Sequence, residues 1–175
     1  CGYPFAYEMD EDALCAVCTQ RYPDFDAHRA SMIFDEHSKK LIHLLKYYDQ
    51  PLMLPQMAKW LARAATEFLD DENLLIVPVP LHPLRLLRRK YNQAGLLATA
   101  LAKETKLPVK HNALKRIKRR APQAGLSREK RLKNARGVFT LTPRHQRALA
   151  NKTILLVDDV MTTGATLNAC AKALR

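Results

Sequence analysis

The apolar positions of the chain follow two patterns, short continuous runs and helical spacing. Leu74–Val77 and Ile154–Val157 are continuous apolar runs, which are typical of strands buried on both faces of a sheet. Apolar residues at helical spacing predict helices from Ser38 (with Ser38 as N-cap), over Gln56–Leu69, over Tyr91–Lys103 and from about Ala165. Ser31–Phe34 further predicts a short strand. Helices that alternate with buried strands indicate an α/β fold with a mostly parallel sheet flanked by helices.

Residues 1–25 differ from the rest of the chain. They are poor in aliphatic residues and rich in Cys, Asp, Tyr and Pro, so they cannot form a core alone. Cys15 and Cys18 form a CxxC, and Cys1 lies upstream. In a cytosolic protein these three cysteines favour a metal over a disulfide, which predicts a small knuckle at 1–25 and a main domain at 26–175. Cys170 lies among apolar residues of a predicted helix and is expected to fill the core.

The start of the chain shows no targeting signal. The first twelve residues are polar and acidic, and no apolar run approaches the ~20 residues that span a bilayer. We therefore expect a cytoplasmic protein without a membrane span. Because the chain starts at Cys1 rather than Met and stops at Arg175 inside a predicted helix, we also expect both ends to be truncated.

Charge is concentrated in one part of the chain. The net charge is +12, yet residues 85–147 alone hold nineteen Lys and Arg against two Glu, which gives +17. Such a block predicts polyanionic partners, namely phosphates or nucleic acid. The alternative is an ordinary solvated basic surface.

The segment Ile154–Thr166, ILLVDDVMTTGAT, combines a buried strand with polar chemistry. The strand ends in two carboxylates, Asp158 and Asp159, and a small, hydroxyl-rich loop with Gly164 leads into a helix. In open α/β sheets ligands bind beyond the carboxyl ends of the strands, where such a loop can surround a phosphate with backbone N–H groups. The carboxylates would then accept the hydroxyls of a ribose or hold a cation. The segment predicts a site for ribose 5-phosphate.

Three alternatives to a ribose phosphate site are weaker. A P-loop needs a GxxxxGK[ST] string and a dinucleotide-binding fold needs GxGxxG, and the chain has neither. The third alternative is structural, with the two Asp simply capping the following helix.

Ile154–Thr166 resembles the phosphoribosyl pyrophosphate (PRPP) motif of the type I phosphoribosyltransferases. Further strings resemble the ComF/GntX branch, the competence protein F-like proteins. These strings are Leu41–Tyr47, Val77–Arg85, Arg88–Ala94, and Gln123 with Leu126, Ser127, Arg131, Asn134 and Phe139. The chain departs from the family pattern at Lys90, where Gly is usual. The family also has two CxxC pairs in its zinc knuckle, and here Cys1 resembles the end of the first pair, which leaves an incomplete set of three zinc ligands. The alternative is that these cysteines hold no metal.

The resemblance implies a role for each part of the site. PRPP would bind to Asp158, Asp159, Val160, Met161, Thr162, Thr163, Gly164, Ala165 and Thr166. Its pyrophosphate would meet Leu81, His82, Arg85, Arg89 and Arg119, and the catalytic residues would be Asp158, Asp159, Arg85 and Arg120. The implied reaction displaces pyrophosphate from C1′ of the ribose, so Mg²⁺ and cationic side chains stabilise the leaving group. The stretch Arg116–Arg136 resembles the mobile loop that closes over this site. For each Arg the alternative is surface charge, and for His82 a structural role.

Three functions fit these observations. The first is a phosphoribosyltransferase, hence a glycosyltransferase, linked through its family to DNA uptake and natural transformation or to the use of nucleic-acid-derived compounds. The second is a non-catalytic protein that associates with single-stranded DNA and a competence helicase, although only Tyr91 and Phe139 supply aromatic rings between residues 85 and 147. The third is a PRPP sensor. The sequence identifies neither the acceptor nor the oligomeric state.

Overall fold

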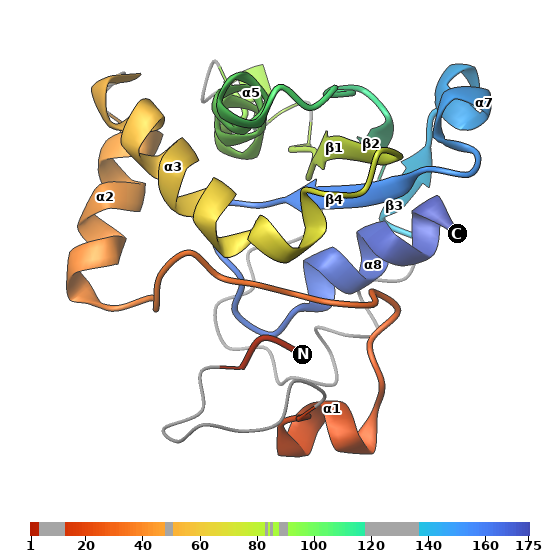
Figure 1. Cartoon of the computed structure of the whole chain (residues 1–175), viewed down its shortest axis with the longest axis horizontal. Helices are drawn as coiled ribbons and strands as arrows, with labels where there is room; N and C mark the ends of the chain where they lie inside the picture. The colour runs from red at the N-terminus through yellow and green to blue at the C-terminus, as the bar shows by residue number, and fades with distance from the viewer. Residues whose placement is uncertain (4–12, 48–50, 83, 85, 88–90, 118–136) are drawn as a thin grey trace.

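The computed structural model describes residues 1–3, 13–47, 51–82, 84, 86–87, 91–117 and 137–175 (Figure 1). In these ranges the helices are α1 (Ala16–Gln20), α2 (Glu36–Tyr47), α3 (Leu54–Ala64), α5 (Gln93–Thr105), α7 (Gln146–Leu149) and α8 (Ala165–Leu174). The strands are β1 (Leu74–Pro78), β2 (Leu114–Arg116), β3 (Phe139–Leu141) and β4 (Thr153–Val157). Short 3-10 turns occupy Pro51–Met53, Thr66–Phe68 and Pro143–His145.

The centre of the molecule is the parallel pair β1 and β4, in which Ile76 lies opposite Leu155 and Pro78 opposite Val157. On the side away from β4, β1 pairs with the segment around Val109. The Ile76 N–H donates to the Pro108 carbonyl and the Ile76 carbonyl accepts the Lys110 N–H, at 2.9 Å each. Strands β2 and β3 form a separate antiparallel pair. The parallel β1–β4 pair confirms the α/β prediction.

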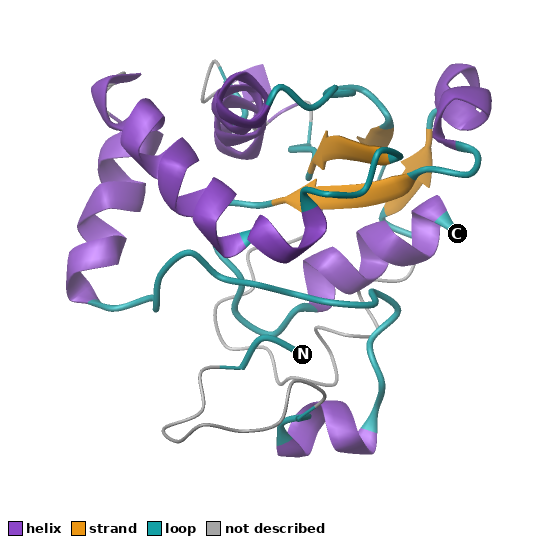
Figure 2. Cartoon of the chain, viewed as in Figure 1, coloured by secondary structure: helices purple, strands orange, loops and turns teal. Residues whose placement is uncertain are grey.

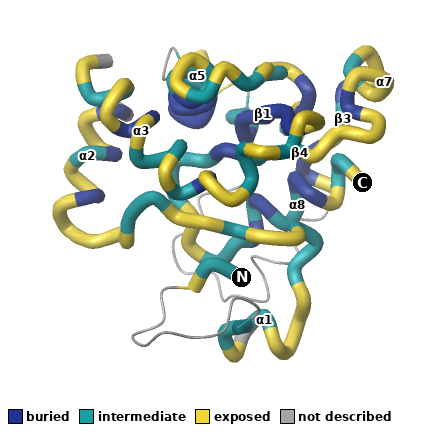
Figure 3. The backbone as a smooth tube through the Cα atoms, viewed as in Figure 1, coloured by how far each residue is buried: buried dark blue, intermediate teal, exposed yellow. Residues whose placement is uncertain are grey.

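Alternate residues of the two central strands face two different apolar cores. Leu75 and Val77 of β1 pack with α8, β2 and β3 in one core, whereas Ile76 packs with α2, α3 and α5 in the other. Helices therefore cover both faces of the sheet (Figure 2). All five residues of β1 are buried (Figure 3), as the continuous apolar run predicts. Cys170 is fully buried in the α8 core, which confirms its expected role as core filler.

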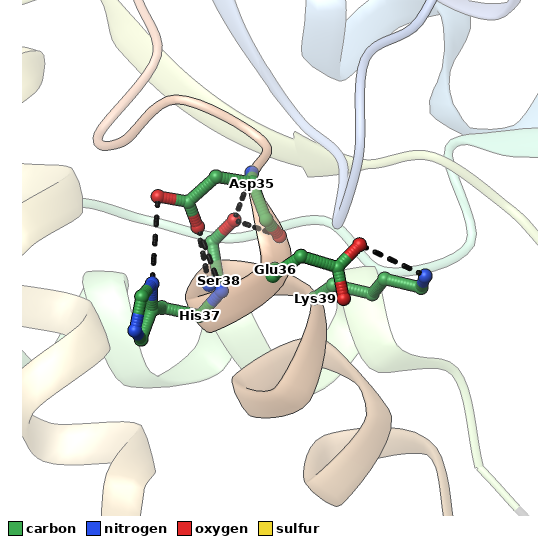
Figure 4. A network of polar contacts seen from close by, with 5 residues as sticks. All are labelled: Asp35, Glu36, His37, Ser38 and Lys39. Carbon is green, nitrogen blue, oxygen red and sulfur yellow. Dashed lines mark hydrogen bonds and ion pairs between the residues drawn. The ribbon is translucent and has the colours of Figure 1, made fainter.

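The start of α2 differs from the sequence prediction. The N-cap is Asp35 rather than Ser38, because the Asp35 Oδ1 accepts the backbone N–H groups of His37 at 2.9 Å and Ser38 at 2.8 Å (Figure 4). The Ser38 hydroxyl in turn accepts the Asp35 N–H at 2.8 Å. The two side chains form a reciprocal capping box, so Ser38 is buried in the first turn instead of preceding it.

Two other predicted elements are corrected. Ser31–Phe34 is not a strand: Ile33 and Phe34 are exposed, and no described segment pairs with them. An isolated extended segment has no ladder to satisfy its backbone, so apolar composition alone did not make a strand. The helix predicted over Gln56–Leu69 starts earlier and ends at Ala64, after which a 3-10 turn follows. Among the described helices, none has the length and apolar character needed to cross a bilayer.

Candidate functional site

The carboxyl ends of β1 and β4 lie side by side at one end of the sheet. The Val79 N–H donates to the Val157 carbonyl at 2.9 Å, directly after the last paired residues. The turn at residues 79–82 and the loop at residues 158–164 therefore start from adjacent positions. Two segments that the sequence predicts to serve one ligand are thus brought together by the parallel pairing.

The phosphate loop, as we name residues 158–164 with the first turn of α8, begins with the two carboxylates. The Asp158 Oδ1 accepts the Asp159 N–H at 2.9 Å, and both side chains are half-buried. Asp158 is thereby held against the backbone of its neighbour at the end of β4. A carboxylate oxygen accepts more than one hydrogen bond, so a half-buried carboxylate at this point can also bind hydroxyl donors or a cation.

Gly164 forms the corner between this loop and α8. Its φ is +69°, in the left-handed region, and the Met161 Cε would lie 3.1 Å from a Cβ added there. Glycine is the residue that adopts this conformation without steric cost. It is also the N-cap of α8, with no side-chain cap from the described residues. The N-cap position is thus held by Gly164 and not by Asp158 or Asp159, and the first turn of α8 can offer its N–H groups to an anion.

Several predicted site residues fall within the described chain. Val160 and Thr163 are half-buried, Met161 and Thr162 are exposed, and Ala165 and Thr166 form the first turn of α8. Leu81 and His82 are half-buried in the turn after β1. Arg85, Arg89, Arg119 and Arg120 lie outside the described residues, as do Lys90 and Gln123, so their predicted roles are untested.

The turn after β1 is fixed by local hydrogen bonds. The His82 Nδ1 accepts the Leu84 N–H at 3.3 Å, and the His82 carbonyl accepts the Leu86 N–H at 3.0 Å. The Asn92 Nδ2 donates to the Val79 carbonyl at 2.9 Å, which ties the start of α5 to the same turn. Asn92 and the His82 ring thus have structural bonds that shape the pyrophosphate turn predicted from the sequence.

Arg116 is a further charged residue near the buried thiol of Cys170. It lies on β2, half-buried, with its guanidinium carbon 5.7 Å from the centre of the Phe139 ring. Burial raises the pKa of the Cys170 thiol, the Asp158 carboxylate raises it further and Arg116 opposes the rise. The charges of Asp158 and Arg116 therefore act in opposite directions on one buried thiol of α8. In the sequence, Arg116 begins the stretch that resembles a closing loop, whereas in the structure Arg116 is the last residue of β2. Residues 118–136 of that stretch lie outside the described residues.

The three predicted zinc ligands are brought together. The sulfurs of Cys1, Cys15 and Cys18 all lie within 4.8 Å of one another. In tetrahedral zinc the metal–sulfur distance is about 2.3 Å, which puts the sulfurs about 3.8 Å apart, so small shifts would bring all three to zinc. The Cys15 N–H also points to the Cys1 Sγ at 3.4 Å. The residues present therefore fit three of the four ligands of a zinc site.

Comparisons with known proteins agree with this geometry. A family model described as the phosphoribosyl transferase domain matches residues 43–175. Competence protein F of Haemophilus influenzae is 32% identical over 179 residues, which cover 100% of this chain and 76% of the relative. DNA utilization protein YhgH of Salmonella typhimurium is 29% identical over 181 residues, covering 99% of this chain and 75% of the relative.

A third relative is more distant. Competence protein ComFC of Bacillus subtilis is 24% identical over 148 residues, covering 84% of this chain and 57% of the relative. No solved structure matches the chain. Together the matches confirm the resemblance that the motifs indicated. The expected division at residue 25 is not tested by them and stays a prediction.

Proposed function

We propose that this chain, which belongs to the phosphoribosyl transferase domain family, binds phosphoribosyl pyrophosphate with Mg²⁺ where β1 and β4 end. The observation that carries the proposal is the adjacency of two unlike segments at one sheet edge. One is the carboxylate pair with the left-handed corner at Gly164, and the other is the turn after β1. A ribose phosphate that also carries a pyrophosphate needs both.

The 5-phosphate would bind the phosphate loop. The first N–H groups of α8 and the hydroxyls of Thr162, Thr163 and Thr166 supply donors, and the dipole of a ten-residue helix favours a negative charge there. The ribose hydroxyls would donate to Asp158 and Asp159, so the two carboxylates face hydroxyls rather than phosphate. This division of ligands removes the repulsion that two acids beside a phosphate would otherwise cause.

The pyrophosphate would lie toward the turn at Leu81 and His82. Mg²⁺ would neutralise its charge, and Arg85, Arg89, Arg119 and Arg120 are the proposed side-chain cations. In a transferase reaction the bond between C1′ and the pyrophosphate oxygen breaks while a bond from C1′ to the acceptor forms. The groups that hold the leaving pyrophosphate therefore matter more for the rate than a general base. We propose this transferase activity without assigning the acceptor.

The cysteine cluster would hold zinc in a structural role. With Cys1, Cys15 and Cys18 as thiolates, the metal would fix a segment that has few apolar residues of its own. The basic block and the competence and DNA utilization names of the relatives support a role linked to DNA uptake or to the use of nucleic-acid-derived compounds. The second candidate, a non-catalytic PRPP sensor or single-stranded-DNA-associated protein with a helicase partner, keeps the same ligand site.

Ligand-dependent melting tests the binding proposal. PRPP with Mg²⁺ at a hundred times its Kd should stabilise the protein by about 2.7 kcal/mol and raise the Tm accordingly. The double variant Asp158→Asn with Asp159→Asn should lose that shift. Asp70→Asn with Glu72→Gln removes the same number of charges from exposed positions before β1, at the opposite edge of the sheet, and should keep it. A shift that survives in the first variant contradicts the assigned role of the carboxylates.

Two further measurements separate the candidates. Release of pyrophosphate with any member of a panel of nucleobases supports the transferase, and binding without release across the panel supports the sensor. Direct binding of single-stranded DNA should weaken steeply as salt rises, because phosphate contacts release counterions. Affinity that does not change with salt would count against DNA binding through the basic block.

A further inference from the structure

The N-terminal segment contacts the phosphate loop through a pair of reciprocal hydrogen bonds. The Asp24 N–H donates to the Asn168 Oδ1 at 2.5 Å, and the Asn168 Nδ2 donates to the Asp24 Oδ2 at 2.6 Å. The bonds are part-buried and join residues 144 positions apart. Asn168 lies one turn into α8, and its own N–H donates to the Gly164 carbonyl at 2.9 Å. The segment is thus bonded to the residue that closes the first turn after the loop.

Phe25 adds an apolar contact at the corner itself. Its ring packs against the core of α8, and the Phe25 Cε1 would lie 3.8 Å from a Cβ on Gly164. The Met161 Cε is at 3.1 Å from the same point. The left-handed corner of the loop is therefore enclosed by Phe25, which comes from the N-terminal segment, and by Met161 of the loop.

The contacts continue from Phe25 to the cysteine cluster. The ring centroids of Phe25 and His28 are 6.3 Å apart and tilted by 53°. The His28 carbonyl and Nδ1 pack against Gly2, which has a φ of +71° and no room for a Cβ. Gly2 directly follows Cys1. A continuous set of contacts therefore runs from Cys1–Gly2 through His28 and Phe25 to Gly164, and Figure 1 shows the N-terminal segment on the α8 side of the sheet.

We infer that Asp24, Phe25 and Asn168 form a clasp that positions the phosphate loop, so that the N-terminal knuckle sets how well the loop is ordered for its ligand. The clasp residues are positioning residues, because they contact Gly164 and the first turn of α8 and are assigned no contact with the ligand. The effect of the clasp on ligand binding rests on the proposed PRPP site. The effect of the clasp on the order of the loop does not depend on which ligand binds.

The physical reason is the cost of ordering the loop. A loop that must turn several N–H groups toward one phosphate loses backbone entropy on binding, and a loop held beforehand loses less. When only a fraction of molecules has the ordered loop, the apparent affinity falls by that fraction. Loosening the clasp should therefore weaken ligand binding by the same factor by which it increases opening of the loop.

Hydrogen exchange on the full chain without ligand tests the clasp directly. Phe25→Ala and Asn168→Ala should each increase exchange of the amides at residues 168–170, which hydrogen-bond back to Gly164 and the first turn of α8, by about tenfold, which corresponds to ~1.4 kcal/mol of lost order. Asp24→Ala should have a smaller effect, because the backbone N–H still reaches Asn168. Amides of β1 and α5 should exchange as before, which separates loosening of the loop from general unfolding.

The matched control is Arg175→Ala. Arg175 and Asp26 form an exposed ion pair at 2.6 Å between the same segment and the same helix, but away from the loop. This variant should leave the exchange at residues 168–170 unchanged, because exposed ion pairs contribute little. Phe25→Leu keeps an apolar side chain at the corner and should restore most of the protection lost in Phe25→Ala.

Binding of PRPP with Mg²⁺ to the same variants completes the test. A Kd that rises about tenfold with the exchange supports both proposals. If the wild type does not bind PRPP with Mg²⁺, the proposed function is overturned. If the clasp variants nevertheless exchange faster, the clasp still stands. Unchanged exchange at residues 168–170 in both Phe25→Ala and Asn168→Ala would overturn the clasp, whatever the ligand does.

Discussion

The phosphate loop and the cysteine cluster are held in place by different forces. The loop starts from β4, which pairs along its length with a fully buried strand, so burial of apolar side chains fixes where the carboxylates lie. Around the cysteine cluster, by contrast, only Phe25 of the described residues 1–3 and 13–25 packs against an apolar core, and the hydrogen bonds between Asp24 and Asn168 join this segment to α8. The first region is positioned by burial in the fold, whereas the second is joined to the fold by these contacts and, as we propose, by zinc bound to its three cysteines. The consequence is that damage to the core should affect both regions, whereas damage to the cluster should reach the loop only through the clasp.

The largest expected effect comes from the shared core. Ile76 of β1 is completely buried in the core that it forms with α2, α3 and α5, so Ile76→Ala should destabilise the protein by about 2–5 kcal/mol through lost burial and the cavity left behind. Denaturant unfolding measures this change. Leu52→Ala, at a side chain that is 81% exposed, is the control and should have little effect. Similar effects of the two variants would contradict the complete burial of Ile76 in this core.

A smaller effect is expected at the corner of the loop. Gly164→Ala places a Cβ on a residue with φ +69°, which costs about 1–2 kcal/mol, and it also presses on Met161. The stability loss is moderate, but the PRPP-dependent rise in Tm should disappear because the corner changes shape. Gly95→Ala, within α5, is the control: its Cβ would meet only Asn92 at 3.4 Å, and the ligand shift should persist. A normal ligand shift in Gly164→Ala would show that the corner is not needed for binding.

A still smaller effect is expected on the pH dependence of stability, through His28, which lies near the cysteine cluster. Burial, followed by nearby positive charges that include Arg29, lowers the pKa of His28 below its usual 6.5. The unfolded chain therefore binds this proton first as pH falls. The contribution of neutral His28 to stability should be fully present above pH 6.5 and should decrease as pH falls through the window below it.

Unfolding free energies at several pH values measure this effect. The His28→Gln variant, which does not titrate, should lose stability less steeply than the wild type between about pH 7 and pH 5. An identical slope in both proteins would mean that His28 is not buried against Gly2.

The smallest perturbation is chemical labelling of the thiols. Cys170 is fully buried and its pKa is raised, so iodoacetamide should leave it unmodified in the native protein. Cys1, Cys15 and Cys18 are half-buried and should react without metal. Added zinc should protect these three together, as a shared metal requires. Protection of only one or two of them by zinc would contradict a common site.

The parts of the fold that follow from local burial could be predicted from the sequence. The continuous apolar runs predicted β1 and β4, although residues 154–156 of β4 are half-buried rather than fully buried as expected, and the polar residues after Val157 predicted the loop and α8. The cap of α2 was predicted three residues late, because Asp35 and Ser38 are both good caps and the sequence alone does not rank them. The strand predicted at Ser31–Phe34 was wrong because a strand depends on a partner that the local pattern does not reveal.

The clasp could not be predicted for a related reason. Asp24 and Asn168 are 144 positions apart, and Asp and Asn are common on solvated turns and helix surfaces that make no tertiary contact. Only the fold brings them together. The contact between Arg116 and Phe139 could not be predicted either, because it depends on the β2–β3 pairing rather than on neighbours in sequence.

Whether the edge of the sheet at β1 and β4 is a PRPP site is decided by an equilibrium titration of the full chain with PRPP, with and without Mg²⁺. We predict saturable binding of one ligand per chain that is strongest with Mg²⁺ and is lost when Asp158 and Asp159 are both replaced by Asn. Binding that the double variant retains, or no binding by the wild type with Mg²⁺ present, would be incompatible with the proposed site.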